Sequence, residues 1–207
     1  MTAKQFFVAF LVVGGLWYGW NRPQSAVAVS APPPSAGVSS PQERQVPVQQ
    51  NLSRGPQFEV NGHTVRALAE YAVTARVLSA KTYRSGREAE LSPLDLALGW
   101  GRMSEPKVID RISISQSGRW YSWRYEGDPP IPRREIEVSS ANVHLIPASA
   151  AVARALDRAE TGKVVALRGY LVEVSSKDGW SWRSSLTRED TGGGACEVMF
   201  VQSVEVR

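Results

Sequence analysis

The sequence predicts an α+β domain dominated by antiparallel β-structure, and three observations lead to this fold class. Most apolar segments after residue 56 are short and β-branched, or alternate with a period of two, as strands do. One segment, residues 149–160, has the spacing of a helix instead. Strands, then one main helix, then more strands with long loops between them favour an antiparallel sheet over repeated β-α-β units.

The clearest strand is the segment 162–174, read GKVVALRGYLVEV, which is almost continuously apolar. Such a run is typical of a strand that is buried on both faces, as in a sandwich or a closed barrel. Gly169 in its middle indicates either a bend at a barrel corner or a point where another backbone comes close. We favour the bend, because the run is longer than the usual strand.

The other strands follow from turn signals and alternation. Asn61-Gly62 is the strongest short turn signal and predicts a hairpin over 58–65. The segment 68–81 fits both a helix and a strand, and its alternation favours the strand. Further strands are predicted at 109–116, 119–125, 134–138, 180–186 and in the last segment, where Val198, Phe200, Val204 and Val206 share a face.

Capping signals predict two helices. Residues 92–99 begin with Ser92 as N-cap and Pro93 at the first helical position. The main helix covers 149–160, with Ser149 as N-cap and an Ala-rich interior. An oligonucleotide/oligosaccharide-binding (OB) barrel also carries one helix between its third and fourth strands. We therefore expect a small OB-like barrel or sandwich over residues 57–207, a topology that carries no function with it.

The N-terminal residues 1–22 are predicted to be a transmembrane anchor. Residues 5–21 carry no charge and would span about 26 Å as a helix. Trp17 and Trp20 lie at the far end, where indole rings favour a headgroup boundary. The small residues Ala26-Val27-Ala28 also fit a cleaved signal peptide. We favour the anchor, because an aromatic cluster is unusual in a segment that is removed.

Residues 23–56 are rich in Pro, Ser, Ala and Gln, which predicts a disordered linker. A spacer of this composition is typical of domains held away from a bilayer. We expect a single-pass protein of the bacterial inner membrane with its C-terminal domain in the periplasm. The contrast in positive charge between Lys4 and Arg22 is too small to fix the orientation by itself.

Composition argues against several classes of function. The net charge of +4 comes from 24 basic and 20 acidic residues scattered along the chain, so no nucleic-acid partner is expected. Cys196 is the single cysteine, and the histidines are His63 and His144. This set cannot build a structural zinc site, and no cofactor motif is present, so neither a metal nor a cofactor is predicted.

Two aromatic and cationic stretches are the candidate binding surface. In a strand, Tyr121, Trp123 and Tyr125 fall on one face, and Trp120 and Arg124 on the other. The candidate ligand-binding residues are Trp120, Tyr121, Trp123, Arg124, Tyr125, Trp180, Trp182 and Arg183. Exposed, they would stack on sugar rings or bases. Turned inward, they would fill the core as cross-strand pairs, and at least one face must do so.

A catalytic alternative rests on Cys196 and His144, with Asn142 as the orienting residue. Such a nucleophilic pair needs a hydrogen bond between side chains that are far apart in the sequence. A histidine between apolar residues is more often structural, and a cysteine beside a strand is more often a small core residue. We therefore predict no enzyme and keep the hydrolase as an alternative.

Three runs carry a resemblance to other proteins: DLALGWGRMS at 95–104, ANVHLIP at 141–147 and DGWSWRSSLTREDTGGGACE at 178–197. Together they resemble an uncharacterised group of small bacterial proteins with an N-terminal membrane segment. The resemblance covers most of the predicted domain and implies no activity. From the sequence we expect a membrane-anchored, non-catalytic binding module for an envelope protein or a peptidoglycan-type glycan. An OB-like nucleic-acid binder remains the alternative if the domain is cytoplasmic.

Overall fold

A computed structural model describes residues 32, 42, 45–190 and 195–207. The predicted membrane anchor, the signal-peptide alternative and most of the predicted linker lie outside these residues. No helix in the described part of the chain is long and apolar enough to cross a membrane.

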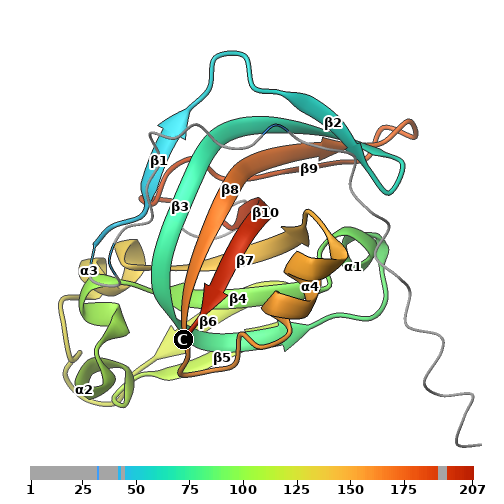
Figure 1. Cartoon of the computed structure of the whole chain (residues 1–207). Helices are drawn as coiled ribbons and strands as arrows, with labels where there is room; N and C mark the ends of the chain where they lie inside the picture. The colour runs from blue at the N-terminus through green and yellow to red at the C-terminus, as the bar shows by residue number, and fades with distance from the viewer. Residues whose placement is uncertain (1–31, 33–41, 43–44, 191–194) are drawn as a thin grey trace, which may run out of the picture.

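The described chain is mainly an antiparallel sheet with a few short helices (Figure 1). The strands are β1 (Val48–Asn51), β2 (Gln57–Val60), β3 (His63–Thr82), β4 (Leu94–Gly99), β5 (Ser113–Ser117), β6 (Trp120–Arg124), β7 (Ser140–Pro147), β8 (Val164–Ser175), β9 (Ser181–Arg183) and β10 (Glu197–Val206). The helices are α1 (Arg87–Leu91), the 3₁₀-helix η1 (Gly101–Ser104), α2 (Pro106–Ile109), α3 (Arg133–Val138) and α4 (Ala150–Leu156).

The strand pairings form a closed ring. β3 pairs with β4, β4 with β7, β7 with β10, β10 with β8, and β8 pairs back with β3. Of these pairs only β7 with β10 is parallel. β1 and β2 extend β3, β9 extends β8, and β5 and β6 form a separate hairpin. The α+β class and its antiparallel character are therefore as predicted.

The ring closes because β3 is long enough to pair twice. Its first part, from Thr64 to Arg76, lies along β8, and its last part, from Arg76 to Thr82, lies along β4. The register shifts between Ala67 and Ala69 and again between Val77 and Ser79. Such bulges bend a strand, and Figure 1 shows β3 as a strongly curved ribbon.

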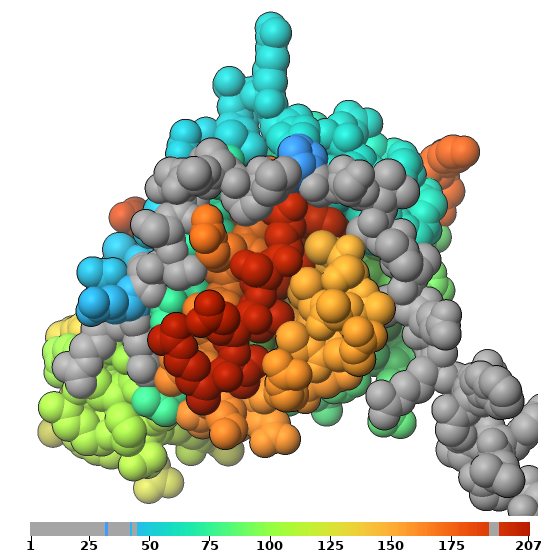
Figure 2. All heavy atoms as spheres, viewed as in Figure 1, coloured from blue at the N-terminus to red at the C-terminus, as the bar shows by residue number. Residues whose placement is uncertain are grey.

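The main core fills the ring. Alternate residues of its strands point inward, among them Val73, Leu96, Val143, Leu167 and Met199. Leu156 and Ala159 pack against the same core, because α4 lies across one side of the ring. Figure 2 shows this helix lying against the exposed end of β10. This burial is the principal stabilising contribution that the sequence pattern predicts.

Two smaller clusters lie outside the ring. One contains Phe58, Tyr170 and Phe200 on the outer face of β2, β8 and β10. The other contains Leu78, Ile112 and Ile136, and holds the β5–β6 hairpin, α2 and α3 against the ring of strands. Both faces of β8 are therefore covered, as predicted for the segment 162–174.

Gly169 follows the interpretation that we did not favour. A Cβ at this position would collide with the carbonyl oxygen of Phe200 in the neighbouring strand, so glycine is required by close backbone approach. The irregularity itself lies in β10, where the register shifts between Val201 and Ser203. This bulge also corrects the last strand: Val198 and Phe200 belong to the outer cluster, whereas Val204 and Val206 pack against the ring core.

The predicted helix over 92–99 is wrong, because these residues contain β4. The capping signals were local, but Leu94, Leu96 and Leu98 alternate with a period of two. Leu96 and Leu98 are completely buried in the ring core. Tertiary burial therefore outweighed the capping signals.

The predicted strand over 134–138 is wrong as well, because the segment is α3. It begins after Pro132, and Arg133 pairs with Glu137 one turn later, at 3.0 Å between Nε and Oε1. Ile136 provides its buried contact. The spacing of the ion pair and the buried residue fits a helix better than a strand.

The hairpin turn and the main helix agree with the predictions apart from their bounds, whereas β7, α1 and α2 were not predicted. Asn61 and Gly62 have positive φ angles of 50° and 78°, as the tight turn between β2 and β3 requires. The Ser149 side chain caps α4 by accepting a hydrogen bond from the Val152 N–H at 3.2 Å. α4 ends at Leu156, β9 is shorter than predicted, and β1 lies within the segment predicted as linker.

Candidate functional site

The candidate site is a cleft of about 240 Å³ between β6, β7 and the described part of the segment 187–197. One wall is aromatic and comes from the hairpin strand β6. The other is polar and comes from the chain around the start of β10. The residues used below are Trp120, Tyr121, Trp123, Arg133, Asn142, Arg188, Asp190, Cys196 and Glu197. We call this hollow the cleft.

Trp120 is the exposed aromatic residue of the cleft. Its side chain is 51% exposed, and the other exposed large hydrophobics among the described residues are Val46 and Val48. Tyr121 and Trp123 lie on the opposite face of β6 and pack against the outer cluster that holds the β5–β6 hairpin. Trp120 therefore points outward. An indole left in water at the rim of a polar hollow is a candidate contact for a ligand.

The polar wall contains acceptors without donors. Glu197 is only 3% exposed, and its Oε2 atom is buried without a hydrogen-bond partner among the described residues. The Oδ1 atom of Asp190 is also buried without a partner among the described residues, while its Oδ2 accepts a hydrogen bond from the Ser185 hydroxyl at 2.7 Å. Buried polar atoms are nearly always satisfied in proteins, so such unpaired oxygens indicate a site where water or a ligand supplies the donor.

Burial also changes the protonation of Glu197. It raises the pKa of this carboxyl to about 8, and its own backbone N–H and the Arg188 guanidinium oppose that shift only in part. The Arg188 guanidinium donates its hydrogen bonds elsewhere, to Gln49 Oε1 at 3.2 Å and to the Pro47 carbonyl at 2.9 Å. It therefore offsets the burial of the Glu197 carboxyl only in part. At neutral pH Glu197 is therefore mostly protonated and can donate as well as accept.

A second polar group, the Asp95 cluster, lies beside the cleft on the outer face of β4 and β7. Asp95 is completely buried. Its Oδ1 accepts from Arg119 Nη1 at 2.6 Å, and its Oδ2 lies 2.9 Å from Nδ1 of His144 in a geometry too bent for a regular hydrogen bond. The Trp182 ring packs on His144 at 4.8 Å between centroids, and the Tyr83 ring lies 3.9 Å from the Arg119 guanidinium carbon.

Arg119 connects the two groups through its backbone. It has a left-handed φ of 70°, which is uncommon for a residue with a side chain. Its N–H donates to the Tyr83 hydroxyl at 3.0 Å, and its carbonyl accepts from Asn142 Nδ2 at 3.0 Å. Asn142 lines the cleft, so the hairpin turn that precedes Trp120 is fixed by the Asp95 cluster on one side and by Asn142 on the other.

The structure brings together only part of the catalytic alternative. Asn142 Nδ2 lies 3.8 Å from the Sγ of Cys196, but no hydrogen bond within the described residues joins Cys196 to His144. His144 turns its Nδ1 to Asp95 instead. Burial raises the pKa of the Cys196 thiol to about 11, although the hydrogen bond from Asn142 opposes the shift. A thiol that stays protonated is a poor nucleophile.

The second aromatic stretch packs down onto the domain. Trp180 and Trp182 lie side by side at 6.3 Å between ring centroids, and both are partly buried against the outer cluster. Trp180 contacts the edge of His63, and Arg183 forms an exposed ion pair with Glu173. In the first stretch, Tyr125 stacks on Trp123 at 6.0 Å. Arg124 is exposed and lies outside the cleft lining.

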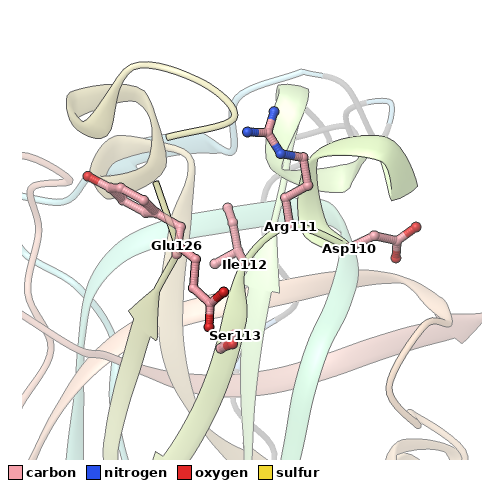
Figure 3. A pocket seen from close by; sticks show the side chains of 6 residues that line it. Asp110, Arg111, Ile112, Ser113 and Glu126 are labelled. Atoms are coloured by element: carbon pink, nitrogen blue, oxygen red, sulfur yellow. The ribbon is translucent and has the colours of Figure 1, made fainter. Parts of the chain in front are cut away.

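A larger hollow of about 330 Å³ lies at the other end of the β5–β6 hairpin. Figure 3 shows that Arg111 and Asp110 point away from each other, while Glu126 lies beside Ser113. The charged ends do not converge on a common point, and the described lining has Tyr125 as its aromatic member. The smaller cleft is therefore the better candidate.

The described residues hold no group of three or more His, Cys, Asp or Glu side chains that could bind a metal ion. Sequence analysis also missed Asp95, Arg119, Arg188, Asp190 and Glu197. A signal was present for two of them, because Asp95 and Glu197 are acidic residues inside alternating apolar strands. The others are ordinary loop or turn residues in the sequence.

Comparisons with protein-family models, with curated proteins and with solved structures found no match for this chain.

Proposed function

We propose that this domain is a non-catalytic binding module whose cleft takes one sugar ring of an envelope glycan. The observation that carries the proposal is the exposed Trp120 beside the unpaired oxygens of Asp190 and Glu197. A sugar ring has an apolar face of C–H groups that can stack on an indole, and a rim of hydroxyls that can donate to carboxyl oxygens. The lining of the cleft offers both partners.

Charge and size support a neutral, small ligand. The lining carries opposite charges that balance, because Arg133 is paired with Glu137 at 3.0 Å, and Arg188 and Asp190 have opposite signs. The volume of about 240 Å³ is below the roughly 300–1,000 Å³ that drug-sized ligands occupy, so a single ring of a longer chain fits better. Glu197, protonated at neutral pH, can also donate to a ring or acetamido oxygen.

We infer further that the closed ring is an OB-type barrel. Its strands in chain order are β3, β4, β7, β8 and β10, and α4 lies between the third and the fourth of them. OB barrels serve both oligosaccharides and oligonucleotides. The nucleic-acid alternative has less support, because a single exposed tryptophan next to carboxylates is a poor match for a stacked, phosphate-bearing strand.

The membrane location belongs to the proposal as well. We propose that residues 1–22 anchor the chain in the inner membrane and that the domain lies in the periplasm, where an envelope glycan is accessible. Its support is the uncharged segment 5–21. A reporter fused after Arg207 that is active only when exported tests the orientation, and activity of a cytoplasm-only reporter would overturn it.

The binding test uses the full chain in detergent micelles, titrated with neutral mono- and disaccharides, including N-acetylated amino sugars. We expect Trp120→Ala to weaken the affinity about tenfold or more, taking the roughly 1–3 kcal/mol of a base stacked on an aromatic side chain as the scale for a stacked sugar ring. Thermal stability should not change, because the side chain is half in water. The matched control is Arg124→Ala, which removes another exposed side chain from β6 outside the cleft.

Equal affinity of the Trp120→Ala variant, or no sugar binding at all, would contradict the proposal. Binding of a single-stranded oligonucleotide that falls steeply with salt would favour the nucleic-acid alternative. The Cys/His hydrolase gains no support from the geometry, because the described residues place Asn142 and the Arg119 carbonyl, not His144, beside the Cys196 thiol.

A further inference from the structure

The outer face of β8 and β10 carries a contact that the proposed function does not use. Pro32, far upstream in the sequence, accepts two hydrogen bonds on its carbonyl oxygen. One comes from the Tyr170 hydroxyl of β8 at 2.9 Å, and the other from Gln202 Nε2 of β10 at 2.9 Å. Two donors that converge on one acceptor form a specific clamp.

The clamp is built by the irregularity in β10. The register shifts at Gln202, between Val201 and Ser203, and a bulge of this kind redirects a side chain. Gly169 on the neighbouring strand has no side chain, which lets the two backbones approach at this point. Tyr170 follows Gly169 directly, so the bulge and the glycine together place the amide of Gln202 beside the Tyr170 hydroxyl.

The surroundings match a proline-containing segment. Tyr170 is only 2% exposed and packs in one cluster with Phe58 and Phe200, whose rings are 4.7 Å apart. Proline-rich segments offer ring faces and carbonyls but few N–H groups, and aromatic surfaces with side-chain donors recognise them. Pro32 precedes Pro33 and Pro34, so its carbonyl belongs to a tertiary amide, a strong acceptor.

One acceptor of the clamp remains open. The Oε1 atom of Gln202 is buried and has no hydrogen-bond partner in the described part of the chain. A buried amide oxygen without a donor indicates that this surface accommodates a further polar group. The face is therefore more than a chance contact with one carbonyl.

We propose that the bulge face of β8 and β10 is a docking site for this chain's own proline-containing segment centred on Pro32. The segment predicted as a linker is then tied to the domain near its beginning. From residue 22 to residue 32 the chain reaches at most about 35 Å, against about 120 Å from residue 22 to residue 57. If residues 1–22 are an anchor, as proposed above, docking holds the domain close to the bilayer; the docking itself does not depend on the anchor.

Limited elastase digestion of the full chain in detergent micelles tests the docking, with cut sites between residues 26 and 40 followed by mass spectrometry. We expect Gln202→Ala to speed cleavage there about fivefold, and the double variant Tyr170→Phe/Gln202→Ala to speed it about tenfold or more, since each removes one hydrogen bond. Ser203→Ala, an exposed change in the same strand, should leave the rate unchanged.

The melting temperature of each variant distinguishes release of the segment from unfolding. Tyr170→Phe keeps the ring and removes only the hydroxyl, so it remains informative if Gln202→Ala fails to fold. Wild-type cleavage rates in a folded double variant would overturn the docking. Protection that disappears on dilution would also overturn it, because the occupant would then be another copy of the chain. Neither result bears on sugar binding in the cleft.

Discussion

The Asp95 cluster and the cleft are neighbouring polar groups on the outside of the same ring of strands, and they meet at Asn142. In the cluster, Oδ1 of Asp95 pairs with the Arg119 guanidinium, whereas Oδ2 faces His144 Nδ1 at 2.9 Å without a regular hydrogen bond. Trp182 packs on His144 and Arg119, and Tyr83 packs on Arg119. In the cleft, one oxygen each of Asp190 and Glu197 has no donor among the described residues, and Trp120 lies in water. The first group therefore holds an ion pair under aromatic rings, and the second combines an exposed indole with carboxyl oxygens that lack a donor.

From this difference we expect the Asp95 cluster to stabilise the fold and the cleft to bind a ligand. A buried charge that is neutralised by near neighbours fixes the fold, and here it fixes the turn that presents Trp120. A buried acceptor that lacks a donor lowers stability unless something binds. The substitutions below test this contrast, from the largest expected effect to the smallest.

Asp95→Ala should have the largest effect. It leaves the half-buried Arg119 beside aromatic rings without its carboxylate, and breaking a buried pair costs up to about 3–5 kcal/mol in the free energy of unfolding. Denaturant unfolding measures the loss. Combining Asp95→Leu with Arg119→Met should recover much of it, because both charges are then gone. A loss below about 1 kcal/mol for Asp95→Ala would mean that the cluster is not the structural group.

Glu197 should make stability fall as the pH rises. Its folded pKa of about 8 lies above the ordinary 4.5, so both states are protonated well below pH 4.5. Above that value the unfolded carboxyl ionises while the folded one does not, and stability is lost until the pH passes about 8. Between pH 5 and pH 7 the loss should be roughly 2–3 kcal/mol.

Glu197→Gln is the matched variant, since it keeps the shape and cannot ionise. We expect its unfolding free energy to lose this pH dependence and to exceed the wild-type value at neutral pH. Parallel pH profiles for the two proteins, from denaturant melts at several pH values, would contradict the assignment. They would mean that Glu197 ionises normally and that the polar wall is already satisfied.

Cys196→Ala should have the smallest effect, about 1 kcal/mol or less on stability. The native thiol should react with an alkylating reagent at pH 8 about a hundredfold more slowly than the thiol of the urea-unfolded chain, because its pKa of about 11 reduces the thiolate. Fast native alkylation would restore the Cys196 hydrolase as an alternative.

The fold was predictable where local pattern and tertiary burial agree. The continuous apolar run of β8 and the Asn61-Gly62 turn have a composition that only one element satisfies, whereas the segment of β3 also fitted a helix and was assigned by its alternation. The prediction failed at β4, where capping residues suggested a helix although the leucines alternate. It failed at α3 because six residues are too few to show a period clearly.

The candidate site was predictable only in its aromatic half. Trp120 was identified from the ladder over 119–125, and the alternation indicated that one face would turn inward. The polar half was missed, because Asp190 and Glu197 come from a loop and a strand end that meet β6 only in the folded chain. The sequence suggested a pair of His144 with Cys196. In the structure, the register of β4 and β7 places His144 opposite Asp95 instead.

The sequence by itself determined the strand and helix signals, the fold class and the presence of two aromatic stretches, since these depend on neighbours within a few residues. The tertiary structure alone decided which aromatic residue remains in water, which carboxylates are buried without donors, and that Gln202 turns outward at a bulge to meet Pro32. These depend on strand register, and a shift of one residue moves every side chain to the opposite face.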